Sequence, residues 1–299
     1  MTRNPTQIFK TLSAPVERRA GDTSPAIMCH KVFDSVCVLS SGDMVCWCAD
    51  VNAQRVYGNV YSDRIADVFN GEKYEEMRDW LLQSAPGIWC PAINGNCSFR
   101  TVPETSLGPR DGKIKQLQLE ATSHCNLKCP ACFVETTFKD DPRLREVRGK
   151  KILPYKTMID IIKQLPDLET IHYYNYGEPF INKDTIPFLS EVKKSRPKIH
   201  VSVSTNGTVL TPTQIAAIAE DSLINDLTFS IDGATQESYA RYRVGGSFNK
   251  AFAKMKELAN ACRNARTWSK YSTQDPAKVH IKWQYILFEW NDSASTSGA

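Results

Sequence analysis

The chain lacks the features that would place it in a membrane, outside the cell or on nucleic acid. No stretch of its 299 residues approaches the ~20 consecutive apolar residues of a transmembrane helix. Residues 1–22 lack the apolar core of a secretory signal peptide. The formal net charge of +4 is too small to indicate nucleic acid as a partner. We therefore expect a cytoplasmic protein that binds neither membranes nor nucleic acid.

Hydrophobic residues and cysteine, in contrast, are well represented. A hydrophobic content of 41% can supply a core, which argues against global disorder. A chain of 299 residues suits one large domain or two smaller ones. Ten cysteines without a secretory signal indicate metal or redox chemistry in a reducing compartment rather than disulfides.

Three of the cysteines are concentrated in one short loop that reads CNLKCPAC. Cys125, Cys129 and Cys132 form a CxxxCxxC pattern directly after the strand-like run Gln116–Glu120. Thiolates select zinc, copper(I) or iron–sulfur clusters, and a [4Fe–4S] cluster normally takes four cysteines. Three thiolates would leave one iron open, and an open metal position is a place for chemistry. A structural zinc site is the alternative.

From residue 113 onward the sequence alternates strand-like and helix-like segments, which is typical of a parallel α/β fold. The expected strands are 116–121, 170–176, 199–204, 227–232 and 279–288. Each has one largely apolar face and one polar or mixed face. A closed eight-stranded barrel fills its interior with aliphatic side chains, and a doubly wound sheet buries both faces. A parallel sheet that curves around a polar lumen fits better than either.

The N-terminal part is expected to be a smaller unit behind a polar, poorly ordered lead-in at residues 1–24. Residues 28–48 are hairpin-like, and a helix is expected over 62–83 with an interruption near Asn70-Gly71. The cysteines that could bind a metal here are Cys29, Cys46 or Cys48, Cys90 and Cys97. A metal could hold together a segment whose core is so modest. Cys37 and Cys262 are expected to be plain thiols, of a strand and of the helix 248–262.

Taken in order, the motifs of residues 113–291 resemble those of the radical S-adenosylmethionine (SAM) enzymes. The cysteine loop is followed by Gly177-Glu178-Pro179, similar to the family's GGEP motif with Tyr176 at its first glycine. Ser204-Thr205-Asn206-Gly207 resembles the TNG motif, and Ser230-Ile231-Asp232-Gly233 with Arg243 resembles the pattern SIDGATQE followed by R.GG.F. The resemblance implies a partial (β/α)6 TIM-like barrel that here lacks its last strand. Either the chain is truncated or a partner covers the open edge.

The resemblance also implies roles for individual residues. Cys125, Cys129 and Cys132 would hold a [4Fe–4S] cluster whose fourth iron binds SAM. The implied SAM-binding positions are Gly177, Glu178 and Pro179 for the amino group, Ser204 and Asn206 in the pocket wall, Ser230 near the ribose, Arg243 rather than Arg241 for the carboxylate, and Gln284 in the lumen. Asp232, in the same motif as Ser230, is included among the cofactor-binding positions. No catalytic side chain is assigned beyond the cluster ligands. Where many relatives have an aromatic residue before the third cysteine, this chain has Ala131.

The N-terminal cysteines resemble the SPASM or "twitch" extension of the same family, which binds an auxiliary [4Fe–4S] cluster and usually follows the barrel. Here it precedes the barrel. The candidate ligands are Cys29, Cys46, Cys48, Cys90 and Cys97, with Cys46 and Cys48 competing for one role and structural zinc as the alternative. The expected organisation is a cluster module at 25–100, a Pro- and Gly-rich linker at 101–112, the barrel at 113–292 and a flexible tail at 293–299.

The implied function is reductive cleavage of SAM to a 5′-deoxyadenosyl radical, which abstracts hydrogen from a peptide or a small molecule such as a sugar. A flavodoxin or ferredoxin would supply the electron. The alternative is a non-catalytic iron–sulfur or zinc module, or a degenerate partner of a complete enzyme. The charged run at 139–151 is expected to be a solvated loop, with a lid over the substrate as its alternative.

Overall fold

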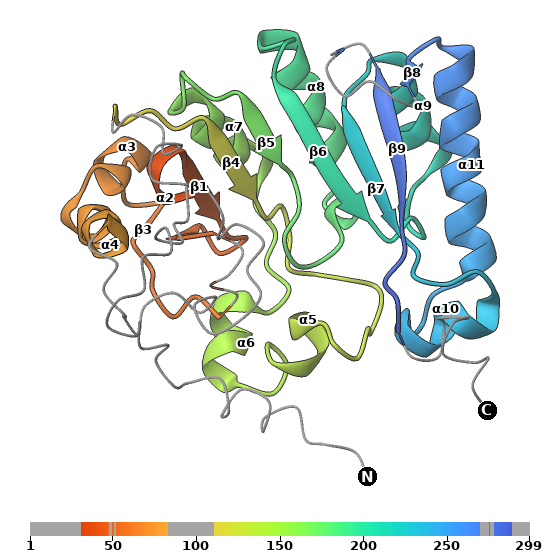
Figure 1. Cartoon of the computed structure of the whole chain (residues 1–299), viewed down its shortest axis with the longest axis horizontal. Helices are drawn as coiled ribbons and strands as arrows, with labels where there is room; N and C mark the ends of the chain where they lie inside the picture. Colours follow the sequence, from red (N-terminus) through yellow and green to blue (C-terminus); the bar gives the residue numbers. More distant parts are fainter. Residues whose placement is uncertain are drawn as a thin grey trace, which may run out of the picture.

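The computed structural model describes residues 31–47, 50, 52–82, 111–269, 275 and 278–288. The described strands form one nine-stranded sheet in the order β3-β2-β1-β4-β5-β6-β7-β9-β8 (Figure 1). Their bounds are β1 Ser35–Val38, β2 Asp43–Val45, β3 Gly58–Asn59, β4 Gln116–Leu119, β5 Thr170–His172, β6 His200–Thr205, β7 Asp226–Ser230, β8 Trp268–Ser269 and β9 Val279–Gln284. Every neighbouring pair from β1 to β8 is parallel. The sheet stays open, with β3 and β8 at its edges, and this confirms the predicted partial barrel.

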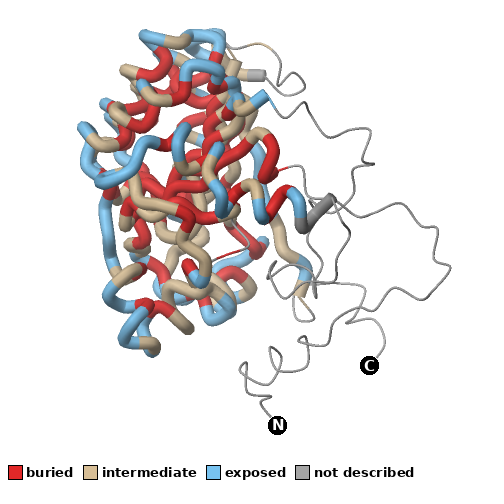
Figure 2. The backbone as a smooth tube through the Cα atoms, turned by 90° about the vertical axis from the view of Figure 1, so that its left-hand side faces the viewer, coloured by how far each residue is buried: buried red, intermediate tan, exposed pale blue. Residues whose placement is uncertain are grey.

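The apolar face of each strand is buried against a layer of helices, as the alternation in the sequence predicts. Leu117, Ile171, Val201 and Leu227 have no exposed surface and belong to one continuous core. The helices over this face are α7 (Tyr155–Lys163), α8 (Thr185–Ser195), α9 (Pro212–Glu220) and α11 (Phe248–Asn264). Figure 2 shows the buried backbone running through the middle of the molecule. Cys262 of α11 is buried in this core, which confirms its prediction as a structural thiol.

The N-terminal hairpin continues the barrel sheet. β1 and β2 pair antiparallel, as predicted, and β1 also pairs in parallel with β4, so that Val38 lies opposite Leu119. Helices α2 (Lys31–Asp34), α3 (Ile65–Phe69) and α4 (Glu72–Leu82) accompany the hairpin, and the break between α3 and α4 lies at the predicted position. The expected module and the expected barrel thus share one sheet. Residues 101–110 of the expected linker lie outside the described residues.

The sequence predicts that β9 has an unpaired edge because no sixth barrel strand follows it, and β8 covers part of this edge. β8 pairs with β9 at Val279 and His280. The remaining residues of β9 have no second neighbour among the described strands. No helix in the described ranges is long and apolar enough to cross a lipid bilayer.

The prediction of a solvated loop at 139–151 is wrong, because this run contains helix α6 (Pro142–Arg148). Asp141 caps the helix by accepting hydrogen bonds from the backbone N–H groups of Arg143 and Leu144, and Pro142 occupies the first turn. Leu144 and Arg148 are four residues apart, so they share a helix face, and both are buried. Helices α5 (Phe133–Thr136), α6 and α10 (Gln236–Tyr242) lie at the carboxyl ends of the strands (Figure 1).

The polar face of the sheet carries a row of side chains that crosses four neighbouring strands. His172, Ser202, Asp226 and His280 are successive register partners across β5, β6, β7 and β9. The Asp226 carboxylate accepts hydrogen bonds from His200 (2.8 Å), His280 (3.0 Å) and Lys282 (2.6 Å). Burial raises the pKa of Asp226, but these hydrogen bonds outweigh it and hold the pKa below its usual range.

This carboxylate should give the fold a measurable pH dependence. Because the pKa of Asp226 is depressed in the folded chain, its contribution is complete above the unfolded value of about 4 and is lost as the pH falls below it. Asp226→Asn should lower the free energy of unfolding by roughly 2 kcal/mol at pH 7, and the difference from the wild type should shrink below about pH 4. Urea unfolding at several pH values measures this. Asp167→Asn, at an exposed position, is the control and should show no such trend.

Candidate functional site

The cysteine loop lies at the carboxyl end of β4 and borders a cavity of about 260 Å³. All three thiols line this cavity, so the structure brings Cys125, Cys129 and Cys132 to one place. The loop is held from outside by a hydrogen bond of 2.9 Å from the backbone N–H of Lys128 to the carbonyl of Val244. It then runs directly into α5, for which Cys132 is the N-terminal cap residue.

Strand ends supply the opposite wall of the cavity. Of the nine positions predicted to bind SAM, six line it: Gly177, Glu178, Ser204, Asn206, Ser230 and Arg243. The other three do not. Pro179 is buried at the start of the short helix η2 (Pro179–Ile181), Asp232 lies behind Arg243, and Gln284 is exposed on β9, where its side chain accepts a hydrogen bond from Ser230.

Gly177 is required by the close packing of its turn against the start of the cysteine loop. Its φ of +89° is a conformation that favours glycine, and a Cβ at this position would lie 2.2 Å from the carbonyl oxygen of Thr122. The next residue, Glu178, donates its backbone N–H to the carbonyl of His124 at 2.8 Å. The turn after β5 and the cysteine loop therefore form one packed unit.

The Glu178 carboxylate fastens this turn to the end of β6. It accepts hydrogen bonds from the hydroxyl of Thr205 and the backbone N–H of Asn206, both at 2.7 Å. Burial raises the pKa of Glu178 to about 7, although these donors and the N–H of Phe180 oppose the shift. Both carboxylate oxygens are thus committed to protein groups at the edge of the cavity.

Arg243 is held between a buried carboxylate and a thiol. Its Nε donates to Oδ2 of Asp232 at 2.7 Å and its Nη2 donates to the same oxygen, while Nη1 lies 3.7 Å from Sγ of Cys129. Asp232 has no exposed surface, and its other oxygen accepts the backbone N–H of Ile286 at 2.8 Å. One guanidinium therefore neutralises a buried acid and faces the cysteine loop with its remaining nitrogen.

Burial disfavours the thiolate forms of the cysteine loop in the metal-free chain, while N–H groups beside two of the sulfurs favour them. Burial raises the pKa of Cys125 to about 11 and also raises the pKa of Cys129, which Arg243 opposes. Asn206 Nδ2 lies 3.9 Å from Sγ of Cys125, and the backbone N–H of Leu127 lies 3.4 Å from it. Metal binding would displace the thiol protons. In the part of the chain that the structure describes, no group of three or more His, Cys, Asp or Glu side chains is arranged to hold a single metal ion.

The donor set fits an iron–sulfur cluster, since three soft thiolates from one loop face a shared cavity with N–H groups and a cation beside them. Among the auxiliary candidates, the structure places Cys46 at the end of β2, partly buried. Cys29, Cys48, Cys90 and Cys97 lie outside the described residues. Cys37 is buried in a second apolar cluster with Leu39, Val45, Trp47 and Ala53.

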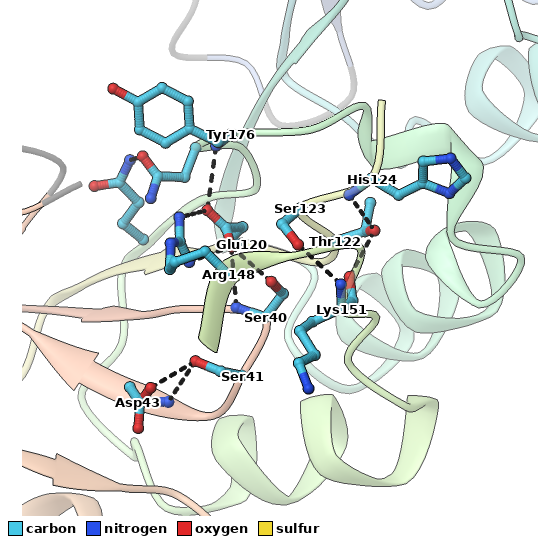
Figure 3. Close-up of polar contacts among 12 residues, drawn as sticks. Ser40, Ser41, Asp43, Glu120, Thr122, Ser123, His124, Arg148, Lys151 and Tyr176 are labelled. Atoms are coloured by element: carbon cyan, nitrogen blue, oxygen red, sulfur yellow. Dashed lines mark hydrogen bonds and ion pairs between the residues drawn. The ribbon is translucent and has the colours of Figure 1, made fainter. Parts of the chain in front are cut away.

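Behind the cavity wall lies a buried ion pair that the sequence analysis missed (Figure 3). Glu120 and Arg148 have fully buried side chains and form two hydrogen bonds of 2.7 Å. Glu120 also accepts the hydroxyl of Ser40 (2.7 Å) and the backbone N–H groups of Ser40 (3.2 Å) and Tyr176 (3.3 Å). One carboxylate thus joins β4, the turn of the N-terminal hairpin, α6 and the turn that carries Gly177.

Aromatic rings complete this contact. The Arg148 guanidinium lies 4.7 Å from the ring centre of Phe138, and Phe138 packs edge-on against Tyr176 at 5.7 Å. Phe133 contacts the ring of Tyr176 as well, at 5.5 Å. The sequence signal that could have revealed Arg148 is the Asp-Pro start of α6 followed by Leu144 and Arg148 on one helix face.

Comparison with known families agrees with these observations. Residues 119–271, more than half of the chain, match the model of the radical SAM superfamily. Residues 29–97 match SPASM, an iron–sulfur cluster-binding domain. The second match precedes the first along the chain, which is the order that the sequence predicts.

Individual relatives are similar over part of the chain. A tungsten-containing aldehyde ferredoxin oxidoreductase cofactor-modifying protein of Pyrococcus furiosus is 33% identical over 36% of this chain and 28% of its own length. Mycofactocin maturase MftC of Mycolicibacterium smegmatis is 31% identical over 48% of this chain and 34% of its own. The crystal structure of Streptococcus suis SuiB bound to precursor peptide SuiA gives a TM-score of 0.41 at 14% identity, over 65% of this chain and 44% of that one. The chain thus matches only about a third of the length of these two curated relatives.

Removing one partner of the buried pair should cost more than removing both charges. Arg148→Met leaves the Glu120 carboxylate buried without its cation and should lower the free energy of unfolding by roughly 3–5 kcal/mol. Glu120→Gln/Arg148→Met should lower it by less, because no unpaired charge remains. Urea unfolding of the iron-free chain measures both. The control is Arg143→Met on the same helix, an exposed side chain that donates to the carbonyl of Asn52 and should change stability little. A double variant less stable than Arg148→Met would contradict this account.

Arg243 can be tested for two separate effects. Arg243→Ala should destabilise the fold, because it leaves Asp232 unpaired, and should weaken SAM binding roughly tenfold to a hundredfold. Adding Asp232→Asn should restore part of the stability but not the SAM affinity. Arg243→Lys should recover only part of the affinity, since an ammonium cannot reproduce the planar fork. Chemical unfolding and calorimetry of SAM binding to the reconstituted protein provide the two readouts.

Arg241→Ala is the control for that experiment, because Arg241 is exposed and does not line the cavity. It should bind SAM nearly normally. Recovery of SAM affinity in the Arg243→Ala/Asp232→Asn protein would mean that Arg243 acts only by holding Asp232 in place.

Proposed function

Because the chain belongs to the radical SAM superfamily, we propose that it cleaves SAM reductively and uses the resulting radical to abstract hydrogen from a substrate in the barrel lumen. The observation that carries the proposal is the shared cavity, where the three thiols of the cysteine loop meet the ends of β5, β6 and β7. In a parallel barrel these carboxyl ends are where functional residues gather.

When bound, a [4Fe–4S] cluster and SAM together supply one-electron cleavage of SAM and a 5′-deoxyadenosyl radical that takes hydrogen from the substrate. Cys125, Cys129 and Cys132 would hold the cluster. Asn206 and Arg243 place N–H groups beside the sulfurs of Cys125 and Cys129, where they would stabilise the thiolate forms. The ion pair with Asp232 holds the Arg243 guanidinium so that its Nη1 faces the cysteine loop.

The remaining wall would hold SAM. Gly177 lets the backbone of its turn approach closely, and Ser204 and Ser230 offer hydroxyl groups from two neighbouring strands. Arg243 remains the candidate for the SAM carboxylate, through N–H groups of its guanidinium that do not bind Asp232, such as those of Nη1. Tyr176 and Phe133 line the same cavity as Ala131 and pack against each other. They are the aromatic candidates for the adenine contact that Ala131 cannot make.

The substrate we propose is a peptide or a small molecule such as a sugar. Support comes from the polar face of the sheet, whose side chains include His172 and Ser202, hydrogen-bonded to each other at 2.9 Å. Burial lowers the pKa of His172 to about 4, helped by Lys31 and His200, so its imidazole is neutral at physiological pH. A flavodoxin or ferredoxin would supply the electron in the cytoplasm, and the SPASM match supports an auxiliary [4Fe–4S] cluster on the N-terminal cysteines.

Anaerobic reconstitution with iron and sulfide tests this proposal. Cys125→Ala, Cys129→Ala and Cys132→Ala should each abolish release of 5′-deoxyadenosine with dithionite while the chain stays folded, because the loop lies outside the main core. Iron analysis of the wild type should give about eight irons per chain for two clusters, and about four in Cys90→Ala/Cys97→Ala. That double variant is the matched control, since it should still cleave SAM.

Release of 5′-deoxyadenosine by all three variants of the cysteine loop would refute the cluster assignment. A wild type that binds a cluster but never cleaves SAM would favour a non-catalytic partner of a complete enzyme. Zinc in place of the second cluster would refute the auxiliary assignment alone.

A further inference from the structure

A second cavity lies against the cysteine loop. It has a volume of about 540 Å³, and it shares Cys125, Leu127, Val134 and Glu135 with the first cavity. Its lining contains no residue from the ends of β5, β6 or β7. Residues of the cysteine loop and of α5 therefore separate two spaces, of which only the first is bordered by the strand ends proposed to hold SAM.

The lining of this second cavity is strongly cationic. Lys128, Lys139, Arg145, Arg148 and Lys150 line it, with Glu135 as its one carboxylate. Glu135 pairs with Lys139 at 3.0 Å, and the charge of Arg148 is neutralised by Glu120 behind the wall. Arg145 donates to the carbonyl oxygen of Lys139, which is uncharged. No carboxylate of the lining compensates the charges of Lys128, Arg145 and Lys150.

We propose that this cationic cavity is where an acidic one-electron carrier protein, of the flavodoxin or ferredoxin kind, docks to reduce the cluster. The proposal rests on the proposed function. The carrier gives up one electron and the cluster accepts it, with no bond made or broken and no proton transferred. Since SAM and substrate would fill the first cavity, the second is the side from which a carrier reaches the loop, close to Cys125, without crossing them.

The exposure of the cationic side chains fits a transient protein partner better than a small anion. Lys128, Arg145 and Lys150 are exposed, and exposed charges on flexible stems hold a single small ion weakly. The one buried cation of the lining, Arg148, is already bound to Glu120 at 2.7 Å. Electron-transfer encounters bury little surface, and a patch of one charge sign accelerates them by long-range attraction.

Rates of cluster reduction test the proposal directly. Reconstituted protein is mixed anaerobically with reduced flavodoxin, and bleaching of the cluster's visible absorbance is followed by stopped flow. Photoreduced 5-deazariboflavin serves as a small uncharged reductant. Arg145→Glu/Lys150→Glu should slow reduction by flavodoxin about tenfold or more at low salt. Its reduction by deazaflavin should match that of the wild type, because neither side chain belongs to the cysteine loop and the charge of the cavity lining does not attract a neutral molecule.

The matched control makes the same change in net charge at the other end of the sheet. Lys194 near the end of α8 and Lys198 just before β6 are exposed and lie at the amino ends of the strands (Figure 1). Lys194→Glu/Lys198→Glu should slow reduction by flavodoxin less than about twofold. Calorimetry of flavodoxin binding to the three proteins should show the same ranking, which provides a readout independent of turnover.

Ionic strength gives a second test that needs no variant. Reduction of the wild type by flavodoxin should slow steeply as salt rises, because the Debye length falls from about 10 Å at 0.1 M to about 3 Å at 1 M. Reduction by deazaflavin should not change. Equal losses in the two charge-reversed proteins, or a salt-independent rate with flavodoxin, would overturn the docking site. Failure of deazaflavin to reduce any wild-type cluster, or reduction without SAM cleavage, would count against the proposed function instead.

Discussion

The carboxylate of Glu120 has no exposed surface, and its two oxygens receive five hydrogen bonds from three other parts of the chain. Such a group must be fully paired, because an unpaired buried charge costs several kcal/mol. The turn at Ser40, the end of α6 at Arg148 and the turn at Tyr176 therefore have to lie where they do. These segments flank the cysteine loop and the Gly177 turn, so the position of the cavity wall depends on this one charge.

A buried ion pair is weak evidence for stability, since apolar residues of similar volume often do as well. Its better-attested role is to specify one arrangement among several. Here the arrangement to be specified is the position of the N-terminal hairpin. β1 lies beside β4 in parallel, and the Ser40 turn that binds Glu120 follows β1 directly. Through Ser40, the pair constrains how the hairpin that carries Cys46 lies relative to β4.

The sequence predicted what local chemistry determines and missed what only tertiary contacts determine. Alternation of apolar residues placed the strands, and the helix break at Asn70-Gly71 and the buried Cys262 were predicted correctly because each follows from local pattern. Arg148 was missed because an arginine in a charged run is usually solvated, and its acid partner lies 28 residues away. The parallel pairing of β1 with β4 joins segments about 80 residues apart, which no periodicity reveals.

The motif residues that resemblance assigns to SAM bind, in the structure, chiefly to one another. Glu178 is fastened to Thr205 and Asn206, and Asp232 is paired with Arg243. These internal partners are needed because a buried carboxylate without hydrogen-bond donors would destabilise the cofactor-free fold. The cofactor would then meet a wall whose charges are already balanced and whose geometry is already fixed. Affinity in such a site comes from preorganised groups, which lose little entropy on binding, more than from unpaired charges waiting for a partner.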